Sequence, residues 1–253
     1  MIQIEHLTKA YGDRTAVEDL SVHVDPGECF AFLGPNGAGK TTTIKVIAGL
    51  LRPTRGTVRV RGHDVVNASQ QAKAKMAYVP DQPYLYDKLS GREFLKFVAD
   101  MYGIGRDAMQ QHLARFGKLF GLDEYLDDLC ESYSHGMKQR VVLTAALLHD
   151  PEVLVVDEPM VGLDPRGSRL VKDLFREHVD RGRCVFLSTH SLAVAEEVAD
   201  RIGIITRGRL VALGNLADLE GQCGGAKGLE AMFLRITEAD ETPAEDAEPC
   251  PPA

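Results

Sequence analysis

The sequence predicts an α/β domain with a mainly parallel sheet. Apolar runs of strand length alternate with segments of helical periodicity, which is the pattern of strands joined by crossover helices. One glycine-rich segment follows an apolar run directly and opens a helical segment. Residues 84–150 contain no convincing strand, so we expect a helical insertion there.

Each predicted strand is a short run rich in apolar and β-branched residues, and the runs are separated by turn or helical segments. They are IQIEHL (2–7), CFAFLG (29–34), GTVRVRG (56–62), MAYVP (76–80), EVLVVDE (152–158), CVFLST (184–189), IGIITRG (202–208) and LVALG (210–214). In the insertion, apolar residues recur at helical spacing and mark one face of a helix. They are Phe94, Phe97, Val98, Met101 and Tyr102.

Composition places the chain among ordinary globular proteins. It has 253 residues, of which 44% are hydrophobic. Its longest apolar stretches are far shorter than the roughly 20 residues of a membrane-spanning helix. Because the N-terminus carries no long apolar run and the five cysteines show no CxxC or zinc spacing, we expect a cytoplasmic protein with reduced thiols.

The net charge of −8 comes mostly from the C-terminal end. Six acidic residues follow the last arginine, Arg235, and without them the net charge is −2. Such a body has no broad basic surface, so we expect no nucleic-acid partner. The stretch 237–253 is acidic and rich in Pro and Ala, and it predicts a disordered tail.

The segment GPNGAGKT, residues 34–41, fits the phosphate-binding pattern GxxxxGK[ST]. Its glycines permit turns that point backbone N–H groups at phosphate oxygens, and the helix that follows adds its positive dipole end. Lys40 supplies a charge for the β and γ phosphates, and Thr41 offers a hydroxyl to Mg²⁺. The sequence therefore predicts that the phosphates of a nucleotide and Mg²⁺ bind here. The candidate nucleotide-binding residues are Gly34, Pro35, Asn36, Gly37, Ala38, Gly39, Lys40, Thr41 and Thr42.

The run VLVVDEP, residues 153–159, ends in two carboxylates. A buried parallel strand would present them at its C-terminal edge, where open α/β sheets bind ligands. We expect Asp157 to hold Mg²⁺ and Glu158 to accept a proton from the attacking water. An acidic strand cap without function is the alternative for this motif taken alone.

Together with YSHGMKQR (133–140), these motifs resemble the ATP-binding subunits of ABC transporters over roughly residues 1–236. The family's signature usually reads LSGGQ, whereas Tyr133, Ser134, His135, Gly136 and Met137 stand here. The resemblance implies a P-loop NTPase core, an N-terminal antiparallel β subdomain and an inserted α-helical subdomain. It also implies a head-to-tail dimer, in which this helix start meets the γ-phosphate held by the other copy. A plain N-cap serine is the alternative for Ser134.

Further positions match the family's order. Tyr11 resembles the aromatic that stacks on adenine, with a core tyrosine as the alternative. Asp164 resembles the residue of the loop that crosses the dimer interface, with an ordinary turn before Pro165 as the alternative. His190 resembles the histidine that contacts the γ-phosphate, with a structural histidine as the alternative. The implied catalytic residues are thus Glu158 and His190.

One position departs from the family pattern. After a YVP segment the family usually carries a glutamine that touches Mg²⁺, but Asp81 and then Gln82 follow Pro80 here. Acidic residues occur at this place in some exporter-type subunits. We therefore favour Asp81 as the residue on the metal side, while Gln82 in a shifted register and a loop without a ligand remain the alternatives.

The resemblance implies an ATPase that powers transport, with export favoured, through a separate integral membrane subunit. It would lie on the inner face of the cell membrane through that partner. The second ATP-binding subunit would be another copy or a different chain. The alternatives are an ABC-type ATPase acting on nucleic acid or ribosomes, and a regulatory nucleotide-binding module without turnover.

Overall fold

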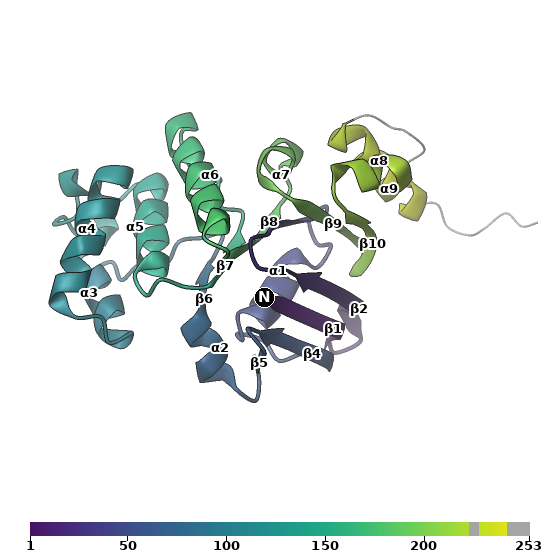
Figure 1. The fold of residues 1–253 in the computed structure, drawn as a ribbon, viewed down its shortest axis with the longest axis horizontal. Coiled ribbons are helices and arrows are strands. Elements are labelled where there is room, and N and C mark those ends of the chain that lie inside the picture. The colour runs from purple at the N-terminus through teal and green to yellow at the C-terminus, as the bar shows by residue number, and fades with distance from the viewer. Residues whose placement is uncertain (223–227, 242–253) are drawn as a thin grey trace, which may run out of the picture.

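The computed structural model describes residues 1–222 and 228–241 and contains two sheets with helices around them (Figure 1). One sheet has six strands in the order β10-β9-β3-β8-β7-β6. Its strands from β9 to β6 are parallel, and β10 pairs with β9 in antiparallel fashion. The other sheet is antiparallel, with the order β2-β1-β4-β5. The predicted fold class is confirmed, including the N-terminal antiparallel part.

The strands are β1 (Ile2–Tyr11), β2 (Arg14–Val24), β3 (Cys29–Leu33), β4 (Arg55–Val60), β5 (His63–Asp64), β6 (Met76–Val79), β7 (Val153–Asp157), β8 (Cys184–Thr189), β9 (Arg201–Thr206) and β10 (Arg209–Gly214). The helices are α1 (Lys40–Ile47), α2 (Ser69–Lys75), α3 (Gly91–Met101), α4 (Arg106–Phe120), α5 (His135–Leu147), α6 (Pro165–Asp180), α7 (Leu192–Val198), α8 (Leu216–Gln222) and α9 (Leu229–Glu241). Two short 3₁₀ helices, η1 (Leu122–Glu124) and η2 (Cys130–Ser132), lie between α4 and α5.

The central strands are apolar along their whole length because the six-stranded sheet is covered on both faces. In β7, Val153 and Val155 pack into a core shared with α1 and the antiparallel sheet. Leu154 and Val156 point the other way, into a core shared with α5, α6 and the insertion. A strand buried on both faces needs no polar alternation. This explains why VLVV is an uninterrupted apolar run.

Strand β2 was not predicted, because its apolar pattern changes phase. Val17 is buried, and the buried positions then resume at Leu20, Val22 and Val24. Between them Asp19 has a positive φ of 50°, and the pairing with β1 shows a register shift. Such an irregularity adds a residue to one strand and breaks the period of two by which a strand is recognised.

The helical insertion forms one end of the molecule, where α3, α4 and α5 lie together (Figure 1). The structure divides its predicted apolar face. Phe94 and Val98 pack on the core, whereas Phe97, Met101 and Tyr102 are exposed by 42%, 69% and 44%. Ser90 caps α3 in a reciprocal arrangement with Glu93, which fixes where the helix begins.

At the opposite end, α8 and α9 pack beside β9 and β10 (Figure 1). Helix α9 is anchored by the fully buried Leu229 and Met232. It continues to Glu241, so it passes the boundary at residue 237 that we expected for the tail, as helices extend readily once a first turn is anchored. The remaining part of that tail, 242–253, lies outside the described residues. In the described part of the chain, no helix combines the length and apolarity that a membrane crossing requires.

Candidate functional site

The C-terminal ends of four neighbouring strands meet at one edge of the six-stranded sheet. Strand β3 leads into the phosphate loop, and β8, its direct neighbour, ends just before His190. Strand β7 follows with Asp157 and Glu158, and β6 ends just before Pro80 and Asp81. Because the strands are parallel, all four ends point to the same side. The sheet thus gathers chemical groups from four distant stretches of sequence.

A cavity of about 790 Å³ opens at this edge. Within the described residues, the predicted ones that line it are Tyr11, Asn36, Gly37, Gly39, Lys40, Thr41, Thr42, Asp81, Asp157, Glu158 and His190. Its size is within the range of small-molecule sites. The cavity is large enough for a nucleotide, and Tyr11, exposed by 48%, stands at it rather than in the core.

The phosphate loop needs its glycines for two different reasons. Gly37 and Gly39 have positive φ values of 80° and 109°, a region that L side chains rarely adopt. A Cβ on Gly39 would also lie 2.5 Å from the carbonyl oxygen of Ala16 at the start of β2. Gly34 has an ordinary φ, but a Cβ there would collide with the backbone of Ile205. The loop is therefore packed against β2 and β9.

Lys40 lies at the start of α1 with its ammonium group folded into the loop. Its Nζ donates to the carbonyl oxygens of Gly34 at 2.7 Å and Pro35 at 3.1 Å. Burial lowers the pKa of Lys40, and the nearby Glu158 and Asp157 carboxylates oppose that shift. The buried Ala38 accepts from the backbone N–H of Gly208 at 2.9 Å and does not line the cavity. Lys40 is thus a largely desolvated cation beside two acids, held where a phosphate would meet it.

Asp157 is the most buried acid of the site, with 2% of its surface exposed. Burial raises the pKa of Asp157, hydrogen bonds from Ser188 and Thr41 lower it, and the negative charges of Asp81 and Glu158 raise it. Asp157 therefore accepts hydrogen bonds from two hydroxyl groups and lies close enough to Asp81 and Glu158 for their negative charges to act on it, with Lys40 nearby. This oxygen set is the kind that Mg²⁺ prefers, and a bound cation would relieve the repulsion between the carboxylates.

Glu158 follows the strand end with a positive φ of 47°, which is uncommon for a side chain of this size. Its backbone N–H donates to the Ser188 carbonyl at 3.0 Å. Its carboxylate accepts from Thr189 Oγ1 at 3.1 Å, and Oε1 lies 2.8 Å from His190 Nδ1. The strained backbone and two side-chain contacts hold the carboxylate in one orientation at the cavity.

Asp81 lines the cavity, and Gln82 is not among the described residues that do so. Both side chains are exposed. Asp81 also acts on the pKa of Asp157 through its charge. Of the two residues, the structure thus places Asp81 at the cavity.

Sequence reasoning missed five residues that also line the cavity, which are Arg14, Thr15, Ala16, Val161 and Arg207. Arg14 begins β2, just after the turn that follows Tyr11, and Arg207 lies in the β9–β10 turn. A basic residue three positions after a candidate adenine-stacking tyrosine was the available signal for Arg14. No local signal marks Arg207, since only folding brings its hairpin to the phosphate loop.

The signature residues lie apart from this cavity. None of Ser134, His135, Gly136 and Met137 is among the described residues that line it. Ser134 caps α5 and accepts from the backbone N–H of Met137 at 3.3 Å. The N-cap interpretation thus holds within one chain.

The signature contacts the loop that follows Glu158. A Cβ added to Gly162 would run into the His135 ring, so these two residues are in close contact. Asp164 caps α6 by accepting from Gly167 N–H at 2.7 Å, and it also pairs with Arg140 at 3.2 Å. The predicted dimer-loop acid therefore has a structural task within the chain.

The site is that of a P-loop nucleotide-binding ATPase. The phosphate loop follows β3 and carries a lysine and a threonine, and the Asp157–Glu158 pair lies on the other side of β8. A sequence model of the family described as "ABC transporter" matches residues 17–161. The chain belongs to this family as an ATP-binding subunit, and it is an ATPase of an ABC transporter.

Similar proteins cover nearly the whole chain. The "Linearmycin resistance ATP-binding protein LnrL" of Bacillus subtilis (strain 168) is 37% identical over 94% of this chain and 77% of its own length. The "Daunorubicin/doxorubicin resistance ATP-binding protein DrrA" of Streptomyces peucetius is 37% identical over 94% of this chain and 71% of its own. A solved "ATP binding subunit of ABC transporter" superposes with a TM-score of 0.90 at 34% identity, covering 94% of this chain and 99% of that one.

Proposed function

We propose that this subunit binds ATP with Mg²⁺ between two head-to-tail copies and uses hydrolysis to drive export through a separate membrane subunit. The observation that carries the proposal is the arrangement at the sheet edge, where Lys40, Thr41, Asp157 and Glu158 face one cavity. ATP and its products would lie there with the phosphates on the loop. The adenine would meet the exposed ring of Tyr11.

Thr41 and Asp157 would hold the Mg²⁺ ion, with Asp81 beside them. When bound, the ion neutralises charge on the β and γ phosphates. The chain's own contribution is to keep the acids gathered, since burial and their mutual repulsion hold Asp157 ready for a cation. Lys40 would turn from the carbonyls of the loop toward the phosphates, because a charged acceptor binds an ammonium group more strongly than a neutral one.

Glu158 would accept the proton of the attacking water. His190 supports this role because its Nδ1 lies 2.8 Å from the carboxylate and limits the orientations that Glu158 can take. His190 itself is largely exposed at the cavity, with 61% of its side chain accessible. It could therefore also donate to a phosphate oxygen.

The other half of the site would come from a second copy, or from a different ATP-binding chain. Ser134 begins α5 with an exposed cap, and the first N–H groups of this helix carry partial positive charge. These groups lie outside the cavity of their own chain. A head-to-tail pair would place them against the phosphate held by the partner, with the Gly162–Asp164 loop beside them.

The exposed aromatic surface of the insertion is the proposed docking site for the membrane subunit. Tyr84 and Tyr86 follow the Asp81 loop, and their rings pack edge to face at 5.9 Å. Tyr86 contacts Phe97 on α3 at 5.8 Å. The side chains are exposed by 74%, 46% and 42%. These aromatic residues follow Asp81 closely in the sequence, so a movement at the phosphates would also move the docking surface. Bound to its membrane partner, the subunit would lie on the inner face of the membrane.

Export is favoured because ATP-binding proteins named for Nod factor export and for SkfA peptide export are among the similar proteins. The comparisons offer no support for an ATPase that acts on nucleic acid or ribosomes.

Glu158→Gln tests the catalytic proposal. The amide keeps the size of the side chain but cannot take a proton, so ATP hydrolysis should fall by about 10²- to 10⁴-fold while ATP binding is retained. Glu196→Gln on the exposed face of α7 is the matched control and should hydrolyse ATP like the parent. Both are measured as steady-state phosphate release and nucleotide binding, with the membrane subunit present if the isolated chain is slow. Equal turnover of Glu158→Gln and the parent would remove Glu158 from the base role.

Phe97→Ser tests the docking surface. This exposed ring should be dispensable for folding but needed for coupling, so transport should fall while ATPase activity of the isolated subunit is unchanged. Leu95→Ser, two positions away and fully buried, should instead lower stability. Transport assays on the reconstituted complex and thermal unfolding of the subunit separate the two effects. A fully coupled Phe97→Ser complex would place docking elsewhere.

A further inference from the structure

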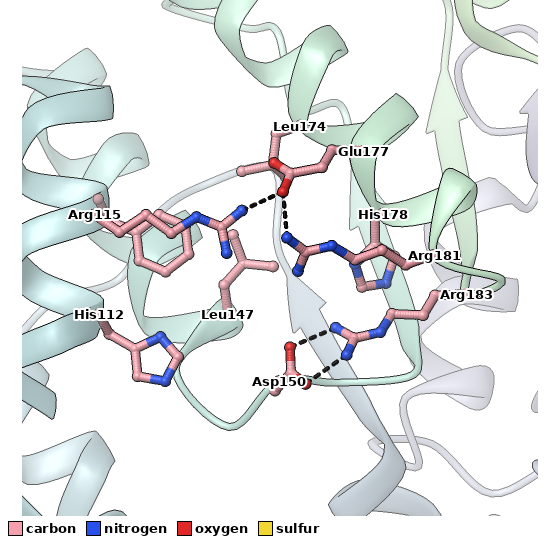
Figure 2. Close-up of a pocket in the computed structure, with 10 residues that line it drawn as sticks. His112, Arg115, Leu147, Asp150, Leu174, Glu177, His178, Arg181 and Arg183 are labelled. Atoms are coloured by element: carbon pink, nitrogen blue, oxygen red, sulfur yellow. Dashed lines mark hydrogen bonds and ion pairs between the residues drawn. The ribbon is translucent and has the colours of Figure 1, made fainter. Parts of the chain in front are cut away.

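A second, smaller cavity lies where the helical insertion meets the central domain (Figure 2). Helix α4 contributes His112 and Arg115, and helix α6 contributes Glu177 and His178. The segment between α6 and β8 adds Arg181 and Arg183, and Asp150 comes from the segment before β7. None of the described residues that line it also lines the nucleotide cavity.

The charges around this cavity do not balance. Three guanidinium groups face two carboxylates, so one positive charge is left over even with both histidines neutral. Arg115 and Arg181 both donate to the same oxygen, Oε1 of Glu177 (Figure 2). Arg183 donates its two terminal nitrogens to the Asp150 carboxylate.

The arginines therefore keep unused donors. A guanidinium carries five N–H groups in a planar fork, and the contacts to Glu177 use one from each arginine. Planar forks of this kind suit oxyanions because two N–H groups can meet two oxygens at once. The cavity is thus lined by cations with capacity for a further anionic partner.

His178 supplies an independent sign of a missing partner. It is only 5% exposed, and its Nε2 atom is fully buried without a hydrogen-bond partner. A buried polar atom left unpaired costs roughly 1–3 kcal/mol, so such atoms usually meet a water or a ligand.

Burial is the main cause that lowers the pKa of both histidines at this cavity. Burial and the charges of Arg183 and Arg181 lower the pKa of His178 to about 4, against the opposing effects of Asp150 and Glu177. Burial also lowers the pKa of His112, with Asp150 opposing and Arg115 adding to the shift. The two imidazoles are therefore neutral near pH 7, and among the described residues the arginines alone supply the positive charge at this cavity.

We propose that this cavity binds a small inorganic oxyanion of the phosphate or sulfate type. Its volume of about 30 Å³ is far below the volume of about 790 Å³ of the nucleotide cavity. It therefore suits an ion of a few atoms rather than a nucleotide.

Such an ion would connect two parts of the protein. Arg115 belongs to the insertion, whereas Arg181 and His178 belong to the central domain, and the pair Arg115–Glu177 already links α4 with α6. An anion shared by these groups would strengthen that link and stiffen the joint between the insertion and the sheet.

Isothermal titration of the full chain with sodium phosphate, against sodium chloride at equal ionic strength and without Mg²⁺, tests the proposal. Two substitutions have opposite expected effects. Arg181→Gln removes donors and should weaken phosphate binding by about tenfold or more. Glu177→Gln removes a competing negative charge and frees its two arginines, so binding should tighten.

The phosphate loop is the obvious competing site, so each titration is repeated in a Lys40→Ala background. The proposal predicts that the response survives Lys40→Ala and follows Arg181 and Glu177. A response that disappears with Lys40→Ala and ignores Arg181→Gln and Glu177→Gln would overturn it, and so would the absence of any response beyond ionic strength. Phenyl phosphate should bind more weakly than phosphate because the cavity has no room for its ring, and tighter binding would overturn the assignment to a free ion.

The imidazole NMR signals give a readout at the site itself, even if one variant fails to fold. Phosphate should shift the signals of His178 and His112, including in the Lys40→Ala chain. His23, an exposed histidine on β2, serves as the control for unspecific effects. Phosphate binding without a shift of His178 and His112 would overturn the proposal.

Discussion

Ser134 has one task within its own chain and a second, proposed task across the dimer, and two substitutions can separate them. Within the chain its hydroxyl accepts from Met137 N–H at 3.3 Å and caps α5. Across the dimer it would face the phosphate of the partner site. Ser134→Ala removes the cap without adding charge. Ser134→Asp keeps an acceptor that caps helices well but brings a negative charge to the proposed interface.

The expected magnitudes differ in kind. Loss of an N-cap costs about 0.5–2 kcal/mol, and this bond is exposed and long, so Ser134→Ala should lie near 0.5–1 kcal/mol. That corresponds to a fall in unfolding temperature of roughly 1–4 °C for a chain of this size. Ser134→Asp should unfold within about 0.5 kcal/mol of the parent, since its charge also suits the helix dipole. A carboxylate about 4 Å from a phosphate charge costs about 4 kcal/mol at an effective dielectric constant near 20, which weakens closure about a thousandfold.

The assay uses Glu158→Gln chains, which should hold ATP long enough to accumulate closed dimers. Light scattering then reports the dimer, and thermal unfolding without nucleotide reports the cap. Gly105→Asp is the matched control, because it adds a carboxylate at the N-cap of α4, where a Cβ meets open space. Ser134→Asp should be stable but monomeric with ATP, whereas Gly105→Asp should dimerise. If Ser134→Asp dimerises like the control, the serine does not face phosphate and the head-to-tail model is wrong at this residue.

Three further outcomes test other parts of the structure. Asp81→Asn should raise the Mg²⁺ concentration for half-maximal ATPase activity while Gln82→Ala leaves it nearly unchanged, and exchanged phenotypes would show the shifted register. In phosphate-free buffer the unfolding free energy should decrease as the pH falls from about 6.5 to 4, because His178 binds a proton in the unfolded chain but not in the folded one. At about 1.36 kcal/mol per pKa unit, the decrease is on the order of 3 kcal/mol. His178→Gln should reduce the pH dependence of the denaturant midpoint. Gly34→Ala should lower the unfolding temperature more than Gly37→Ala, because the Cβ on residue 34 would collide with the backbone of Ile205. The Cβ on residue 37 meets open space, so Gly37→Ala costs only the strain of a positive φ, about 1–2 kcal/mol. Equal losses would contradict the packing of the loop.

The sequence alone determined those features whose functional residues are adjacent in the chain. The phosphate loop places its glycines and Lys40 within eight residues, between a strand and a helix, so its conformation and its ligand follow from local rules. The pair Asp157–Glu158 is similar, since an abrupt end to an apolar run marks the ligand-binding edge of a parallel sheet. The family resemblance then connected these motifs with ATP hydrolysis.

The spacing of apolar residues predicted some elements fully and others only in part. The spacing of the α3 residues predicted a helix face, but which of them packs inward depends on the elements around it. Phe94 packs on the core and Phe97 is exposed, although both belong to the same stripe. Strand β2 was not predicted because the irregularity at Asp19 interrupts the alternation of buried and exposed residues by which strands are recognised.

The tertiary structure alone decided which distant residues share the site. His190 reaches Glu158 because β8 lies beside β7, and Asp81 is near Asp157 because β6 is the next strand. Arg207 reaches the phosphate loop through a hairpin far along the chain, and the cavity around His178 exists only where the insertion meets α6. Turns, caps and periods arise from interactions between near neighbours and can be read along the chain. Strand order and the packing of one subdomain on another depend on the free energy of burying whole surfaces together, which no short stretch of sequence contains.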